Sequence, residues 1–135
     1  MLKMLSKGRF LSEKDVADLE QRLALQLPSA YRKFLYENNG GVPGNRMMVI
    51  DVRGLQGGAA DIQLFLGIDQ EIESSNIEWA KRVLSDRIPV HFLPIAEDSG
   101  GNTFCLSFAQ REVGAVYYCD VEGFEPTTCY FVAKD

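Results

Sequence analysis

The stretch Leu27–Gly41 constrains the fold most, because it contains the start, the buried face and the end of one short helix. Pro28 suits a first helical turn, where its missing N–H group is not needed. Asn39-Gly40-Gly41 then ends the helix, since Asn and Gly enter the left-handed backbone region at the least cost. Between these signals, one stripe recurs at helical spacing: Tyr31, Phe34, Leu35 and Asn38.

A second helix is predicted just before this stretch. Ser12 and Asp15 have the spacing of a capping box, and Val16, Leu19 and Leu23 then recur at helical spacing. The helix should run to about residue 25, so that a tight corner joins the two helices. Residues 1–11 form a basic lead-in with no predicted conformation, and residues 12–135 are predicted to form a single domain.

The rest of the chain predicts one more helix and six strands. Ser75-Asn76-Ile77-Glu78 is a second capping-box pattern, and it predicts a helix that turns Trp79 and Val83 toward a sheet. Pro94 favours a sheet edge or a strand end. Most links between strands are too short for crossovers, which predicts antiparallel pairing. The predicted fold class is α+β: a mostly antiparallel sheet of about six strands, with the N-terminal helix pair and one further helix packed on it. The predicted strands are 47–52, 62–66, 92–96, 102–108, 115–119 and 128–133.

Charge and composition exclude some classes of function. The formal net charge of −5 argues against direct binding of nucleic acid, because neutralising phosphates requires clustered Lys and Arg. The same charge permits a basic partner, although many acidic proteins are acidic only for solubility. Cys105, Cys119 and Cys129 match no zinc spacing and are predicted to be buried free thiols. The N-terminus lacks the apolar run of a signal peptide, and no run is long enough to span a bilayer. We therefore predict a cytoplasmic protein with no membrane contact.

Two polar turns hold the candidate chemistry. The turn Asp98-Ser99-Gly100-Gly101-Asn102 is either a nest of backbone N–H groups that binds an anion or a tight β-turn. The β-turn is favoured, because the Lys and following helix of a phosphate loop are missing. Glu97 and Asp98 would form an acid–base or metal site with Asp120 and Glu122 only if the two turns meet. An acidic rim that faces a protein partner is favoured over that site, and simple solvation of the turn acids is the remaining alternative.

The other reactive or aromatic residues carry weaker signals. His91 is the only histidine and has no nucleophile motif near it, so a structural or surface role is favoured. Tyr117 and Tyr118 are adjacent in a strand and point to opposite faces, so the outward one is a candidate partner contact. We assign Tyr118 to this surface and predict no catalytic, cofactor-binding or metal-binding residue. The candidate partner-binding residues are Glu97, Asp98, Asn102, Tyr118, Asp120 and Glu122.

Four motifs in a fixed order carry a resemblance to a known family. The first is the Leu27–Gly41 pattern, and the second is Leu93-Pro94-Ile95-Ala96. Gly100-Gly101-Asn102 with Cys105-Leu106 follows, and then Gly114 with Val116-Tyr117-Tyr118 and Asp120. Over roughly residues 12–133 the chain resembles the SUKH superfamily, the SMI/KNR-like domain of fungal cell-wall regulators and bacterial toxin-immunity proteins.

This resemblance implies a fold and a function. It implies helices packed around a mostly antiparallel sheet, no catalytic apparatus and no cofactor. It further implies a non-enzymatic protein-binding module, of the kind that neutralises a cognate bacterial toxin such as a basic nuclease. A regulatory scaffold domain in a larger complex is the alternative, and a small-ligand or metal-binding protein is less favoured. Members commonly end in a further helix, whereas this sequence stops at Asp135. We therefore expect part of the sheet to be open to a second copy, as a homodimer, or to a partner.

Overall fold

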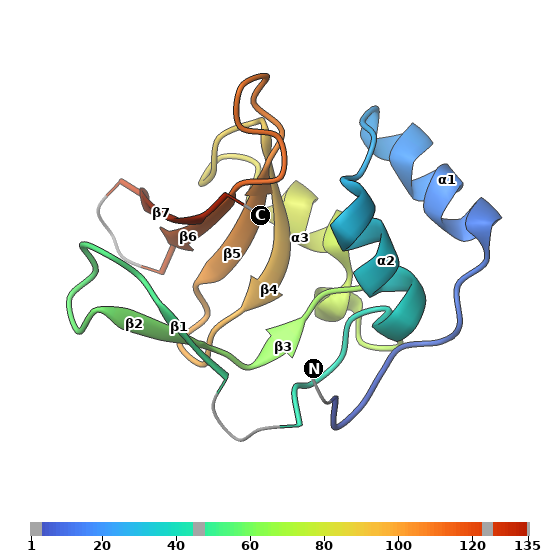
Figure 1. The fold of residues 1–135 in the computed structure, drawn as a ribbon, viewed down its shortest axis with the longest axis horizontal. Helices are drawn as coiled ribbons and strands as arrows, with labels where there is room; N and C mark the ends of the chain where they lie inside the picture. Colours follow the sequence, from blue (N-terminus) through green and yellow to red (C-terminus); the bar gives the residue numbers. More distant parts are fainter. Residues whose placement is uncertain (1–3, 45–47, 123–125, 135) are drawn as a thin grey trace.

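The computed structural model describes residues 4–44, 48–122 and 126–134. Met47, predicted as the first residue of a strand, lies outside these ranges. The described helices pack with a two-stranded and a five-stranded antiparallel sheet, which confirms the predicted α+β class (Figure 1). None of these helices has the length and apolar character needed to cross a bilayer. The helices are α1 (Glu13–Leu23), α2 (Ser29–Asn38), a 3₁₀ turn (Glu73–Ser75) and α3 (Ile77–Val83). The strands are β1 (Met48–Asp51), β2 (Ala59–Ile62), β3 (Leu64–Phe65), β4 (Phe92–Glu97), β5 (Thr103–Ser107), β6 (Val116–Asp120) and β7 (Thr128–Ala133).

The N-terminal helix pair forms as its local signals predict. The Ser12 hydroxyl accepts from the Asp15 backbone N–H at 3.2 Å, and the Asp15 carboxylate accepts from the Ser12 N–H at 2.8 Å. Ala24 takes a left-handed conformation, with φ of 54°, and ends α1 slightly before the predicted boundary. Pro28 is the N-cap of α2 and therefore precedes its first turn. Asn39, with φ of 48°, ends α2 at the predicted place.

The strands divide into two sheets, whereas the sequence predicted one. The large sheet has the order β3-β4-β5-β6-β7, and β1 and β2 form a separate ribbon. The segment predicted as one strand, 62–66, is shared between them: Ile62 pairs with Met48 in the ribbon, and Leu64 pairs with Glu97 in the large sheet. A two-residue β3 also explains Pro94, because β3 pairs only with the last residues of β4 and leaves Pro94 without a strand on that side.

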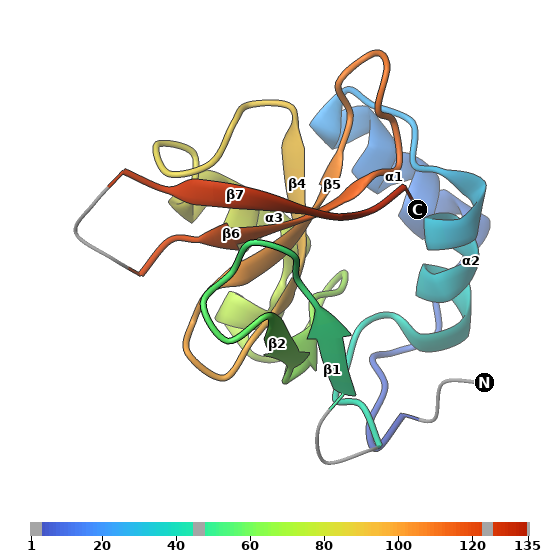
Figure 2. The same ribbon diagram turned by 60° about the vertical axis from the view of Figure 1, so that its left-hand side comes forward.

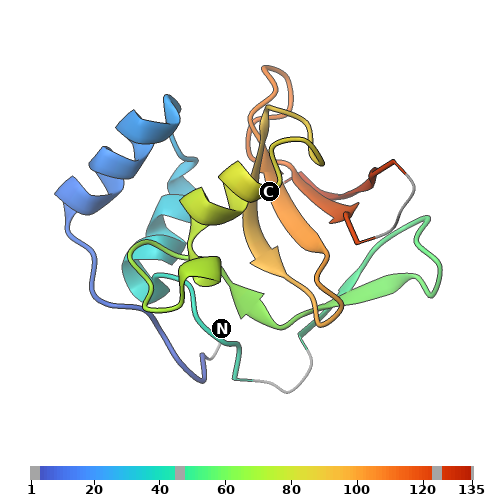
Figure 3. The ribbon, with the colours of Figure 1, turned by 180° about the vertical axis from the view of Figure 1, so that it is seen from behind.

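The two faces of the large sheet have different covers. Helix α3 lies behind the sheet in Figure 1 and in front of it in Figure 3, while the β1–β2 ribbon packs on the opposite face. The second predicted capping box is wrong, because Ser75 belongs to the 3₁₀ turn and Asn76 precedes α3 with no side-chain cap. Helix α3 buries Ile77 and Ala80 and packs Trp79 against the core, whereas Val83 is 48% exposed, so Val83 is the residue of the predicted face that does not turn inward.

The lead-in packs on the domain. The Leu5 N–H donates to the Val42 carbonyl at 2.7 Å, and the Gly8 N–H donates to the Asn38 carbonyl at 2.9 Å. Leu11 is 1% exposed in the core between the helices and the sheet. The segment just after α2 also covers β3, since Gly41 and Phe65 exchange two backbone hydrogen bonds of 3.0 and 2.8 Å. One edge of the large sheet is therefore closed by the chain itself.

Candidate partner-binding surface

The turn between β4 and β5 is a β-turn stabilised from inside by Asp98. The Gly101 N–H donates to the Asp98 carbonyl at 3.3 Å, which closes the turn. One carboxylate oxygen of Asp98 accepts from the Gly100 N–H at 2.9 Å and from the Asn102 N–H at 2.8 Å. These are the N–H groups that an anion-binding nest would offer, and the protein's own carboxylate already occupies them. The geometry therefore supports the β-turn.

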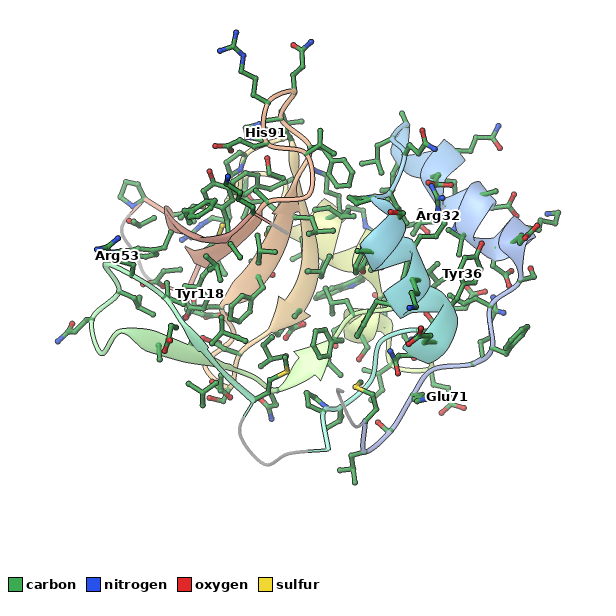
Figure 4. All side chains as sticks on the ribbon, in the orientation of Figure 1. Arg32, Tyr36, Arg53, Glu71, His91 and Tyr118 are labelled. Carbon is green, nitrogen blue, oxygen red and sulfur yellow. The ribbon has the colours of Figure 1, made fainter. Side chains whose placement is uncertain are left out.

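Tyr118 supports this turn from the interior. Its hydroxyl donates to the second carboxylate oxygen of Asp98, and its ring packs edge-on against Phe104. Burial, and then the hydrogen bond to Asp98, raise the pKa of Tyr118 far above its usual value, so its hydroxyl remains a donor. Tyr118 is 3% exposed, and its assignment as the outward tyrosine is wrong. Figure 4 shows it between the ribbon and the large sheet.

Asn102 ties the turn to the end of β6. Its side-chain carbonyl accepts from the backbone N–H groups of Val121 at 2.9 Å and Glu122 at 3.1 Å. The Glu122 side chain lies across Gly101, where an added Cβ would come within 2.5 Å of the Glu122 carboxylate. Gly101 has φ of +89°, so the turn requires glycine there for its backbone conformation. The two turns that the sequence left apart therefore meet at one end of the sheet.

The acidic side chains gather around this junction on both faces of the sheet. On the ribbon face, a pocket of about 450 Å³ is lined by Asp98 and Asp120 and also by Asp61 of β2. On the α3 face, Glu97 and Glu122 line a smaller cavity of about 250 Å³. Within the described ranges, none of these five acids forms an ion pair. The junction thus concentrates uncompensated negative charge, and we call it the acidic end: Asp61, Glu97, Asp98, Asp120 and Glu122.

Sequence reasoning missed Asp61. The Ser99 hydroxyl donates to its carboxylate at 3.0 Å, and the Ser99 N–H donates at 3.3 Å. In the sequence, Asp61 is 36 or more residues from the other four acids, and the β1–β2 ribbon places it beside the β4–β5 turn. An acid in the middle of a short apolar strand carries no local signal of this contact.

The environment of Glu97 opposes the charge of its carboxylate. Partial burial raises its pKa above the usual value, and the nearby Asp98 and Glu122 add to the rise. Glu97→Gln should therefore stabilise the protein at pH 7, by about 1–2 °C in Tm, since much of the repulsion is screened by solvent. The unfolded state binds a proton less readily than the folded state at this side chain. The advantage of Gln should thus disappear as the pH falls through the raised pKa toward 4.5.

Thermal unfolding of both proteins between pH 4 and 8 measures this effect. Glu71→Gln is the matched control, because Glu71 is exposed and lies outside the acidic end. A Tm difference for Glu97→Gln that is absent at pH 7, or that grows toward pH 4, would contradict the assigned repulsion.

The remaining candidate residues lie elsewhere. His91 is exposed at the opposite end of β4 from the Asp98 turn (Figure 4). The centroids of its ring and the Phe92 ring are 4.9 Å apart. Cys105 and Cys119 are buried free thiols, and Cys129 is a half-buried free thiol. Among the residues that the structure describes, no group of three or more His, Cys, Asp or Glu side chains is arranged to hold a metal ion. A further pocket, of about 550 Å³, lies between the lead-in and the 64–75 segment, away from the acidic end.

Comparison with protein-family models places the chain in a known family. A model of the SMI1/KNR4 family (SUKH-1) matches residues 11–135, in agreement with the resemblance seen in the sequence. No curated protein and no solved structure matches the chain.

Proposed function

This chain belongs to the SMI1/KNR4 family (SUKH-1), and we propose that it is a non-enzymatic immunity protein that binds and neutralises a cognate toxin through the acidic end. The family includes toxin-immunity proteins and is generally non-catalytic. The observation that carries the proposal is the convergence of five acids from β2, the β4–β5 turn and the end of β6, without ion pairs in the described chain. Such a surface is complementary to a basic protein, such as a nuclease.

The electrostatics of the acidic end favour a basic protein over a small cation. The acids line two cavities on opposite faces of the sheet, so their charge is spread across a surface broader than one ion. Opposite charges on two proteins speed their encounter and reject wrong partners. Because Glu97 already carries repulsion from Asp98 and Glu122, a partner's cation at this place would relieve it.

The experiment begins with affinity capture from the native cell, including the product of the neighbouring gene. The captured protein's affinity is then measured for the parent and for the double variant Asp120→Lys/Glu122→Lys. We expect binding to weaken by well over tenfold, with an association rate that depends less on salt. Asp98 is left unchanged, because it holds the turn and its loss would confuse folding with binding.

The matched control is Glu71→Lys/Asp86→Lys, which alters net charge equally at two exposed acids outside the acidic end. It should retain nearly all of the affinity, and melting curves should show both double variants folded. Equal affinity of the parent and Asp120→Lys/Glu122→Lys would remove the acidic end as the interface. Capture of several weakly bound proteins, with none at nanomolar affinity, would favour a regulatory scaffold over toxin neutralisation, which requires slow release.

A further inference from the structure

The two edges of the large sheet differ in how they are closed. The edge at β3 exchanges backbone hydrogen bonds with Gly41. At the other edge, β7 pairs only with β6, and within the described residues its outward backbone groups form no hydrogen bond (Figure 2). Such a row of unpaired N–H and C=O groups is a template for another strand.

Strand β7 also lacks the usual protection of an edge. Its six residues, Thr128–Ala133, include neither proline nor a charged side chain. Phe131 is 49% exposed and stands edge-on to Tyr117 at 5.7 Å, and Tyr117 in turn packs on Phe92 at 4.7 Å. An aromatic row on the α3 face of the sheet therefore ends at the open edge with a half-exposed ring.

We propose that the β7 edge pairs with β7 of a second copy, antiparallel and about a two-fold axis, to form a homodimer. The charge pattern selects this occupant. A basic partner would be drawn to the acidic end, whereas an uncharged strand is matched by another uncharged strand. A two-fold axis brings the same surface of both copies together, so the exposed Phe131 rings approach each other.

The direction of pairing follows from the ends of β7. Thr128 pairs with Asp120, so the acidic end lies at the start of β7, while the exposed Lys134 follows its last residue. Antiparallel pairing places Lys134 near the acidic end of the second copy. It also separates the two acidic ends by about 20 Å, the length of six strand residues and more than a Debye length. Parallel pairing would set acid beside acid and lysine beside lysine.

The dimer and the toxin-binding proposal rest on different groups: the dimer uses the backbone edge of β7 and the Phe131 ring, whereas the acidic end is formed by side chains of Asp61, Glu97, Asp98, Asp120 and Glu122. The contact is small, which predicts a reversible dimer with micromolar dissociation. The two acidic ends would lie at opposite ends of the pair, each near Lys134 of the other copy.

Light scattering coupled to gel filtration, over a hundredfold range of protein concentration, tests the dimer. We expect the mass to rise from monomer toward dimer, and Phe131→Lys to weaken association at least tenfold. Val113→Lys is the matched control, since Val113 is 55% exposed and lies outside β7. Lys134→Glu should weaken association about fivefold at low salt if the strands are antiparallel, and should leave it unchanged if they are parallel.

Amide hydrogen exchange at high and low concentration locates the contact. Outward β7 amides should become protected only where the dimer forms. A monomer at every concentration would overturn the proposal, and so would a dimer that Phe131→Lys leaves intact. Protection of β7 in a monomer only after toxin is added would assign the edge to the toxin and would also overturn it.

Discussion

Replacing Asn39 with alanine should lower the free energy of unfolding by about 3 kcal/mol or more. Asn39 is 1% exposed, and its side chain makes three hydrogen bonds across the fold. Its amide nitrogen donates to the Ile68 carbonyl at 2.9 Å and to the Arg9 carbonyl at 3.1 Å, while its carbonyl accepts from the Ile68 N–H at 2.7 Å. Alanine would leave both backbone groups of buried Ile68 without these partners.

The backbone conformation at position 39 adds to the loss of stability. Asn39 has φ of 48°, a conformation that asparagine tolerates better than alanine. Urea unfolding of the parent and Asn39→Ala measures the difference. Asn38→Ala is the matched control, because Asn38 is half-buried and, among the described residues, its side chain donates only to the Phe34 carbonyl of its own helix. We expect it to cost less than about 1 kcal/mol. Equal losses at the two positions would show that Asn39 does not join the segments as described.

Replacing Gly41 with alanine should destabilise the protein by a similar amount, about 3 kcal/mol, through steric conflict. Gly41 has φ of +108°, and an added Cβ would lie 2.1 Å from the backbone carbonyl oxygen of Ser6. A backbone atom cannot move aside as a flexible side chain can, so the lead-in has to separate from the segment after α2. Its hydrogen bonds to Val42 would be lost with it.

Gly57→Ala separates this conflict from backbone strain. Gly57 has φ of +88°, but nothing lies within 4 Å of its added Cβ, so only the strain of about 1 kcal/mol should appear. Trypsin provides a second measurement, since a detached lead-in exposes Lys7 and Arg9 to cleavage. Equal stability of Gly41→Ala and Gly57→Ala, with unchanged cleavage at the lead-in, would contradict the predicted clash.

Features with a local cause could be predicted from the sequence. The Ser12 cap, the end of α2 at Asn39 and the β-turn at Gly100 and Gly101 depend on residues close in the chain. The Ser, Asn and Gly residues at these positions have strong conformational preferences, so they predicted the helix ends and the turn. The contacts of the Asn39 side chain with Ile68, 29 residues away, had no such signal.

Features set by strand pairing could not be predicted. Tyr117 and Tyr118 are chemically alike, and alternation shows only that they face opposite ways. The cover of each face decides which is buried, and the ribbon that packs over Tyr118 comes from a distant segment. The same ribbon splits the predicted strand 62–66 and brings Asp61 to the acidic end. Tertiary pairing thus determined the parts of the candidate site that single-sequence patterns missed.

The junction at the β4–β5 turn separates two tasks among neighbouring residues. Asp98, Asn102 and Tyr118 hold the backbone through hydrogen bonds to one another's segments, whereas the side chains of Asp120 and Glu122 form no hydrogen bond within the described chain. Substitution of Asp120 or Glu122 would therefore change the charge pattern without changing the backbone of the turn. For the proposed toxin-binding role, this division means that exchanging Asp120 and Glu122 changes the charge offered to a partner, while Asp98, Asn102 and Tyr118 keep the shape of the acidic end.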